Sequence, residues 1–229
     1  MSAHSAPLPH EYPVDDQFGR ATMGKMGMWF FLLSDAFSFS GFLLAYGILR
    51  YGSDTWRCTG ELAEATGCAP EPGFGIVFTA ILTFILIISS VTMVIAYAEM
   101  TENNRSGTLT WLGATIFGGI LFLCGQAQEY FGTFDMLIPG HHPGLIKEGL
   151  LFGKSHYATT FYCITAFHGM HVLTGVLLLM RTWFRIFTGH CTSDDGRLNY
   201  NELEIVGLFW HFVDLVWILV FTVVYLIPE

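Results

Sequence analysis

Residues 161–175, FYCITAFHGMHVLTG, and residues 209–217, FWHFVDLVW, decide what kind of fold this chain can adopt. Both stretches are apolar enough to lie in a lipid bilayer, yet between them they carry His168, His171, His211 and Asp214. An ionisable side chain at membrane depth costs roughly 2.5–3.5 kcal/mol on insertion scales, so it normally has a function or a partner. We therefore expect these four side chains to face the interior of a helix bundle or a binding partner.

The composition is that of an integral membrane protein. Of the 229 residues, 52% are hydrophobic and only 13% are charged, whereas a soluble domain has about 25% charged residues. The formal net charge of −9 lies largely outside the apolar runs, which predicts acidic, water-facing loops and gives no support to nucleic-acid binding. The chain starts without a basic segment and its first apolar run is about 24 residues long, so we interpret that run as a retained span and not as a signal peptide.

Five apolar runs predict an all-α, polytopic membrane helix bundle with five transmembrane helices. About 20 apolar residues cross the hydrocarbon core of a bilayer. The predicted spans cover about residues 26–49, 74–98, 108–128, 155–180 and 205–227. Residues 1–22 are polar and contain three prolines, which favours a poorly ordered tail, and residues 23–229 form the transmembrane domain.

An odd number of spans places the termini on opposite sides of the membrane, so the basic residues can be counted by side. Six lie on the side of the N-terminus and four on the other side. The six are Arg20, Lys25, Arg105, Arg181, Arg185 and Arg197, and the four are Arg50, Arg57, Lys147 and Lys154. By the positive-inside rule, this count favours a cytoplasmic N-terminus and a periplasmic C-terminus in a bacterial-type inner membrane.

The loop after the first span then faces an oxidising compartment. It contains Cys58 and Cys68, whereas Cys124 and Cys163 lie inside apolar runs and Cys191 lies in another loop. Disulfides persist only on oxidising sides of a membrane. We therefore predict a Cys58–Cys68 disulfide.

Two aspartates lie at similar depth in spans that run in the same direction. Asp35 and Asp214 are each the tenth residue of their span, which places both near the middle of the bilayer at 1.5 Å per residue. His211 is three residues before Asp214, so an imidazole N–H can donate to the carboxyl group on the same helix face. A polar pair that fixes helix packing is the favoured interpretation, and contact with a lipid headgroup, a proton-transfer group or a partner subunit is the alternative.

The three intramembrane histidines also raise the question of a cofactor. His168 and His211 lie on different helices, as the two ligands of a haem b in a helical bundle would. Asp214 and the three histidines could be assembled into a zinc or copper site. Neither spacing is specific to a cofactor, and the small residues near the histidines are equally what plain helix packing uses.

Four segments resemble subunit III of the haem–copper respiratory oxidases. The fourth span resembles that family's T-G-x-H-G-x-H-V-x-x-G segment, with Ala166 where a glycine is usual, and the fifth resembles E-x-x-x-x-Y-W-H-F-V-D-x-V-W, with Phe209 for the tyrosine. QAQEY, residues 126–130, matches Q-A-x-E-Y, and the first span matches F-x-x-S-E-x-x-x-F-x-x-F with Asp35 for the glutamate. The resemblance covers roughly residues 22–228.

This resemblance implies an accessory subunit without a catalytic centre of its own. Such a subunit binds no haem or copper, which reside in partner subunits. It packs against the catalytic subunit I and other oxidase subunits, supports proton uptake and holds phospholipids. Five spans correspond to the short form of a family whose larger members have seven. The resemblance assigns intramembrane contacts with lipid or with other subunits to six residues, Asp35, Glu129, His168, His171, His211 and Asp214.

Two alternatives remain open at this point. The chain could accompany a quinol oxidase or a nitric oxide reductase in place of a cytochrome c oxidase. It could also be a membrane cytochrome that ligates haem through His168 and His211. The visible spectrum of the isolated chain discriminates the last alternative, because only a cytochrome would show a Soret band.

Overall fold

The computed structural model describes residues 14–15, 21–53, 56–58, 69–70, 76–132, 144–146, 150–153, 155–190 and 200–227. In this part of the chain there are five helices long and apolar enough to cross a membrane, which confirms the predicted fold class. They are α1 (Met23–Tyr51), α3 (Ile76–Thr101), α4 (Arg105–Phe131), α5 (His156–Thr188) and α6 (Asn201–Val220), and α6 continues as the π-helix η2 (Phe221–Leu226). Two short strand pairs accompany them: β1 (Val14–Asp15) is antiparallel to β2 (Ala21–Thr22), and β3 (Arg57–Cys58) is parallel to β4 (Ala69–Pro70).

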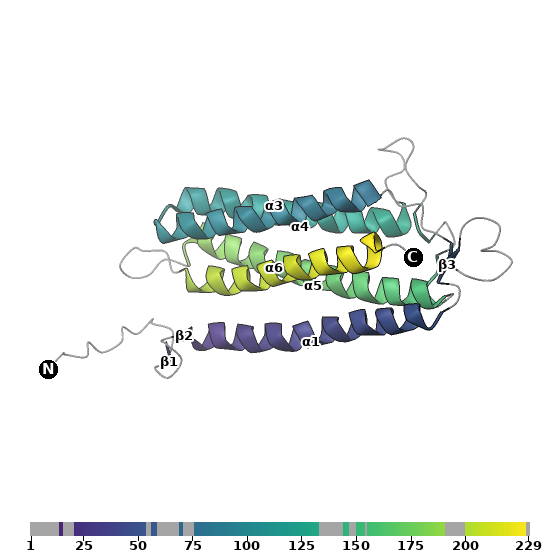
Figure 1. Ribbon diagram of the computed structural model, residues 1–229. Coiled ribbons are helices and arrows are strands. Elements are labelled where there is room, and N and C mark those ends of the chain that lie inside the picture. The colour runs from purple at the N-terminus through teal and green to yellow at the C-terminus, as the bar shows by residue number, and fades with distance from the viewer. Residues whose placement is uncertain are drawn as a thin grey trace.

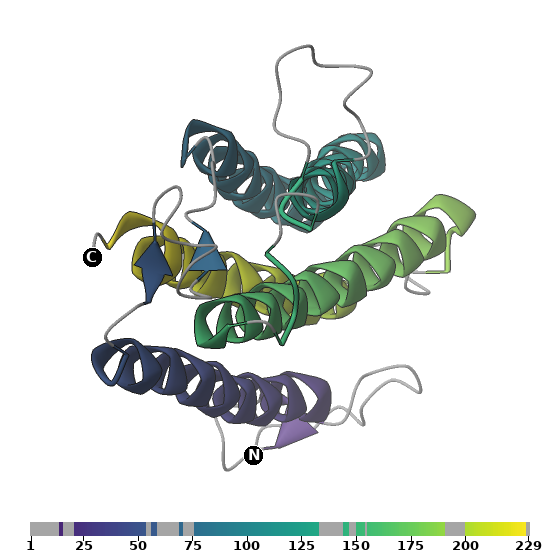
Figure 2. The same cartoon turned by 90° about the vertical axis from the view of Figure 1, so that its right-hand side faces the viewer.

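The helices form three layers and alternate in direction along the chain (Figure 1). The pair α3 and α4 lies on one side, α5 and α6 lie in the middle, and α1 lies on the opposite side (Figures 1 and 2). Helix α1 packs mainly against α5 and α6. The middle layer therefore contacts both outer layers and contains the two stretches that define the fold.

The helix ends follow from local sequence signals. Thr22, Asn104 and Ser155 cap the N-termini of α1, α4 and α5 by accepting a backbone N–H with their side-chain oxygens, as N-cap residues do. Gly189 ends α5 with a φ of 82°, a left-handed conformation that favours glycine. Helix α5 thus continues past the predicted span end at Met180 to Thr188. The arginines that end its apolar run are good helix formers, so they stop the span without stopping the helix.

Small residues permit close packing of the middle layer around Trp210. A Cβ atom built on Gly119 of α4 would lie 2.6 Å from the indole of Trp210, and one on Gly175 of α5 would lie 2.8 Å from it. The indole is 1% exposed, and its N–H donates to the hydroxyl of Ser89 on α3 at 3.2 Å. One tryptophan of α6 therefore contacts three other helices, α3, α4 and α5, because small side chains let the backbones approach.

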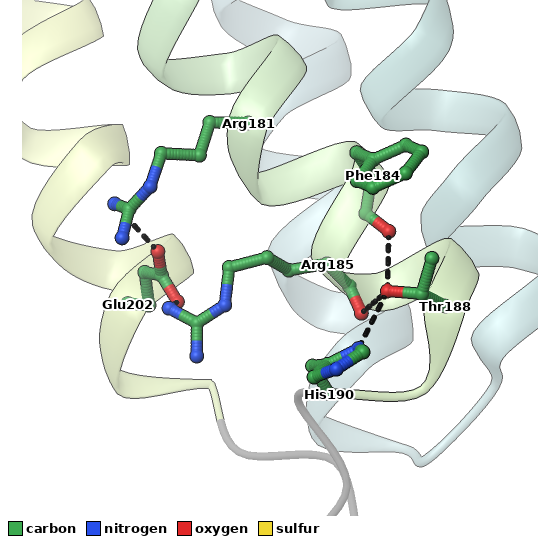
Figure 3. Close-up of polar contacts among 6 residues, drawn as sticks. All are labelled: Arg181, Phe184, Arg185, Thr188, His190 and Glu202. Carbon is green, nitrogen blue, oxygen red and sulfur yellow. Dashed lines mark hydrogen bonds and ion pairs between the residues drawn. The ribbon is translucent and has the colours of Figure 1, made fainter.

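A charged cluster joins the end of α5 to the start of α6 (Figure 3). The two carboxylate oxygens of Glu202 accept from Arg181 Nη1 at 3.2 Å and from Arg185 Nη1 at 2.5 Å. Arginine near a helix C-terminus and glutamate in the first turn of the next helix each also complement the dipole of their own helix. We call Arg181, Arg185 and Glu202 the arginine clamp. A guanidinium N–H of Arg105, at the start of α4, donates to the carbonyl of Phe187 and brings a third helix to this end.

Candidate functional site

The first polar cluster joins α1 to α5 through Asp35 and His171. The Nε2 atom of His171 lies 3.2 Å from the Oδ1 atom of Asp35, and the two side chains are 12% and 7% exposed. The other ring nitrogen of His171, Nδ1, lies 2.7 Å from the carbonyl oxygen of Phe167. A carbonyl only accepts, so Nδ1 carries a proton. A hydrogen bond between Nε2 and Asp35 then needs a second proton. This proton lies either on Nε2, which makes the ring an imidazolium, or on the carboxyl group of Asp35.

Aromatic rings surround this pair. Phe39 of α1 lies 5.4 Å from the His171 ring and 6.4 Å from the His168 ring, measured between ring centroids. Phe167 lies 4.6 Å from His171. The only charged or chargeable contact of Asp35 in the described residues is His171, and its second oxygen has no hydrogen-bond partner there. The pair is thus a polar contact that links α1 to the bundle from within an apolar layer.

His168 lies one helical turn from His171 and is completely enclosed. Its ring lies 4.7 Å from Trp217 and 5.7 Å from Phe122, and the residue is 0% exposed. Neither ring nitrogen has a hydrogen-bond partner among the described residues. The imidazole therefore packs as an aromatic side chain, and protein atoms fill the space that a bound porphyrin would need.

The second polar cluster joins α3 to α6. The Nδ1 atom of His211 lies 2.6 Å from the hydroxyl oxygen of Ser90. Ser90 also interacts with the carboxyl group of Asp214, whose Oδ1 atom has no hydrogen-bond partner in the described chain. The predicted direct bond between His211 and Asp214 is not observed. Instead, the hydroxyl of Ser90, on the neighbouring helix α3, interacts with both side chains.

The third polar cluster surrounds Glu129, near the C-terminus of α4 and at the end of the bundle opposite the arginine clamp. Its Oε1 atom accepts from the hydroxyl of Tyr225, in the π-helix η2, at 3.0 Å and from the hydroxyl of Thr79 at 3.4 Å. Glu129 is 6% exposed. This carboxyl group therefore ties α4 to α3 and to the end of α6, as buried polar groups with satisfied partners do.

The six predicted site residues thus occupy separate clusters and do not converge on one centre. Within the described residues there is no group of three or more histidine, cysteine, aspartate or glutamate side chains arranged to hold a metal ion. Aromatic rings enclose His168, whereas His211 faces Ser90 on α3. The residues present do not fit a haem shared between them.

Sequence reasoning missed three partners, Ser90, Thr79 and Tyr225. All three are uncharged residues in apolar runs, and each contributes a hydroxyl to one of the ionisable groups. Ser90 belongs to the dipeptide Ser89–Ser90 in the middle of a span without charges. Two polar residues in an otherwise apolar run indicate a candidate hydrogen-bonding site. They do not identify the helix that Ser90 faces.

The predicted disulfide falls partly outside the described residues, because Cys68 is not among them. Cys58 lies in β3, where its register partner is Pro70. The cysteines within α4 and α5, Cys124 and Cys163, are free. The Cys58–Cys68 bridge remains a prediction, and peptide mapping under non-reducing conditions tests it.

Replacing Ser90 with alanine is expected to destabilise the contact between α3 and α6 by about 1 kcal/mol, the typical contribution of one intramembrane hydrogen bond. The matched control is Thr110→Ala, because the Thr110 hydroxyl is exposed and bonds only to the carbonyl of Ser106 in its own helix. Unfolding in mixed detergent micelles measures both variants. Equal stability of Ser90→Ala and wild type would show that the 2.6 Å contact with His211 contributes nothing.

Comparison with known proteins gives a consistent result across nearly the whole chain. Residues 20–228 match the family model described as Cytochrome c oxidase subunit III. The chain is similar to cytochrome c oxidase subunit 3 of Synechocystis sp., with 31% identity over 91% of this chain and 78% of that protein. It is also similar to cytochrome bo(3) ubiquinol oxidase subunit 3 of Pseudomonas aeruginosa, with 29% identity over 98% of this chain and 92% of that protein. Cytochrome c oxidase subunit 3 of Alkalihalophilus pseudofirmus is 30% identical over 90% of each chain.

Proposed function

The chain belongs to the cytochrome c oxidase subunit III family, and we propose that it serves as an accessory, non-redox subunit of a haem–copper terminal oxidase. In this role it packs beside the catalytic subunit I, which holds the haem and copper. It supports proton uptake by that subunit and binds phospholipid. We place it in a bacterial-type cytoplasmic membrane, with the N-terminus in the cytoplasm and the C-terminus in the periplasm.

The family match over residues 20–228 carries this proposal. Two properties of the intramembrane polar groups support it. The two bonded histidines each contact a protein partner, Asp35 or Ser90, and His168 is enclosed by aromatic rings. Side chains used in this way hold helices together, and that is the task of a subunit which supports chemistry located elsewhere.

The relatives of this chain are named for oxidases with two different electron donors. Relatives named cytochrome c oxidase subunit 3 and relatives named bo(3) ubiquinol oxidase subunit 3 are about equally similar to this chain, at 31% and 29% identity. The proposal therefore concerns a haem–copper oxidase of either type. Identification of the partner subunits that co-purify with the chain decides between cytochrome c and quinol as the electron donor.

Two spectra test the proposal. The complex captured through a tag on this chain is expected to show haem absorption and to contain a haem–copper subunit I. The chain separated from its partners is expected to show no Soret band. A Soret band stoichiometric with the separated chain would overturn the accessory role and favour the membrane cytochrome.

Replacing Asp214 with asparagine is expected to leave the haem content of the assembled oxidase unchanged and to weaken retention of this subunit or shorten the lifetime of turnover. The reason is that Asp214 lies at the α3–α6 contact and is 7% exposed, so the substitution changes helix packing and not a haem ligand. Haem content per complex and subunit ratio after purification are the measurements. A proportional loss of haem would mean that Asp214 belongs to a redox site.

A further inference from the structure

A groove between α3 and α6 opens beside His211. It has a cavity volume of about 180 Å³ and is open on one side. Its apolar walls come from Met93, Val94, Leu203 and Leu208, with Gly207 between them. We call it the α3–α6 groove. Met93 and Leu203 are fully buried, whereas Val94 is 54% exposed on the outer surface, so the groove opens toward the surrounding bilayer.

Polar side chains lie at both ends of the α3–α6 groove. Tyr97 and Glu204 line one end, where the carboxylate of Glu204 pairs with Lys25 of α1 at 2.7 Å. His211 lines the other end. Glu204 lies in the first turn of α6, and His211 follows it by seven residues, or about 10 Å along the helix. The groove therefore runs from the end of the bundle toward the middle of the membrane.

The imidazole of His211 has one ring nitrogen available to a ligand. Its Nδ1 atom is held by Ser90 at 2.6 Å, and no described residue bonds its Nε2 atom. A polar atom left without a partner in an apolar environment costs about 1–3 kcal/mol. Occupation by a lipid acyl chain would leave Nε2 in that state, whereas a ligand with an oxygen at this depth would satisfy it.

The volume of the groove sets the size of that ligand. An apolar cavity of about 150 Å³ accommodates benzene, so a groove of about 180 Å³ accommodates one six-membered ring with small substituents. Its apolar walls and few polar groups are typical of small-molecule sites. The opening beside Val94 leads to lipid, so a long apolar tail attached to the ring can remain in the bilayer.

From these observations we propose that the α3–α6 groove binds the ring of an isoprenoid quinone or quinol, with one ring oxygen hydrogen-bonded to Nε2 of His211. A quinone oxygen accepts from an Nε2–H, and a quinol hydroxyl donates to an unprotonated Nε2. Tyr97 lines the other end of the groove, so substituents of the ring point toward it. Binding requires no electron transfer by this chain, and it is independent of which reductant feeds the complex.

Photoaffinity labelling of the purified complex tests the site. The probe is an azido-benzoquinone with a ten-carbon tail, added to the complex in nanodiscs of phosphatidylcholine that contain no quinone. Labelled peptides of this chain are mapped by mass spectrometry, which separates them from any quinone site on another subunit. Labelling is expected on residues 93–97 and 203–211, and an excess of unlabelled short-tailed quinone is expected to suppress it.

Variants of the groove decide whether the label reports this site. Gly207→Leu fills the groove and is expected to lower labelling at least tenfold. Val94→Phe, on the α3 wall, is the second groove-filling variant if the first does not assemble. His211→Leu is expected to weaken labelling and His211→Gln to restore part of it. The control is Gly41→Leu, because a Cβ atom on Gly41 meets no described atom within 4 Å.

Two outcomes would overturn the proposal. In the first, label on this chain persists unchanged in an assembled groove-filling variant. In the second, no label appears on the wild-type chain and native mass spectrometry finds a phospholipid that is retained by the wild type and lost from Gly207→Leu. Either result leaves the accessory role intact, because that role is tested by haem content and co-purification.

Discussion

Replacing Asp35 with alanine is expected to lower the free energy of unfolding by about 3 kcal/mol and to loosen α1 from the bundle. Removing one partner of a buried pair costs about 3–5 kcal/mol. The lower end of this range applies because neither side chain is completely enclosed: they are 12% and 7% exposed. The effect falls on α1 because only four residues of this helix are buried, whereas ten residues of α6 are.

The double substitution provides the sharper measurement. Replacing both Asp35 and His171 with leucine leaves no unpaired polar group, and a pair replaced by apolar side chains is nearly neutral. The double variant is therefore expected to be more stable than Asp35→Leu alone. Ser38→Ala is the control, because the Ser38 hydroxyl bonds to Ser34 on the exposed side of α1. Additive losses from the two single variants, measured by unfolding in mixed micelles, would show that the 3.2 Å contact carries no coupling energy.

Replacing Trp210 with alanine is expected to destabilise the bundle by about 3–5 kcal/mol, the usual cost of emptying a large aromatic site. Gly119, Gly175 and Ser89 lie against this indole. Glycines cannot extend into the space left behind, because they have no side chain to move. The loss is expected as failure of the chain to remain with the complex at a temperature that the wild type tolerates.

Two variants separate the contributions of Trp210. Trp210→Phe keeps most of the volume and removes the donor to Ser89, so about 1 kcal/mol is expected. Trp29→Ala removes the same side chain at a position that is 59% exposed and is expected to change the stability of the bundle little. If Trp29→Ala and Trp210→Ala were equally harmful, the packing of the middle layer would not be what holds the bundle together.

The five helices could be predicted because their signal is local. A run of about 20 apolar residues is sufficient to identify a span, and each long helix of the structure contains one. The end of α5 was missed because hydropathy falls at Arg181, whereas backbone hydrogen bonding continues to Gly189. Hydropathy measures burial in lipid, and helix formation does not require it.

The ionisable residues could be found from sequence, but their partners could not. His211 and Asp214 are correctly placed on α6, and their spacing favoured a bond between them. In the structure, Ser90 on α3 bonds His211 in its place. Asp35 was expected at the same depth as Asp214, and its partner is His171 on α5. Such pairings depend on which helices become neighbours, and the periodicity of one helix contains no information about its neighbours.

The length of α5 has a consequence for the thickness of membrane that suits this subunit. Its 33 residues span about 50 Å, whereas the hydrocarbon core of a bilayer is about 30 Å thick. The arginine clamp fixes this overhanging end. In a thicker bilayer, its two guanidinium groups would enter the hydrocarbon, where the cost of each charge rises with depth to roughly 2.5–3.5 kcal/mol at the centre on insertion scales. A thinner bilayer leaves the same groups in water at little cost. The hydrophobic mismatch of the subunit is therefore one-sided, and it favours sorting into thin membranes and against thick, sterol-rich ones.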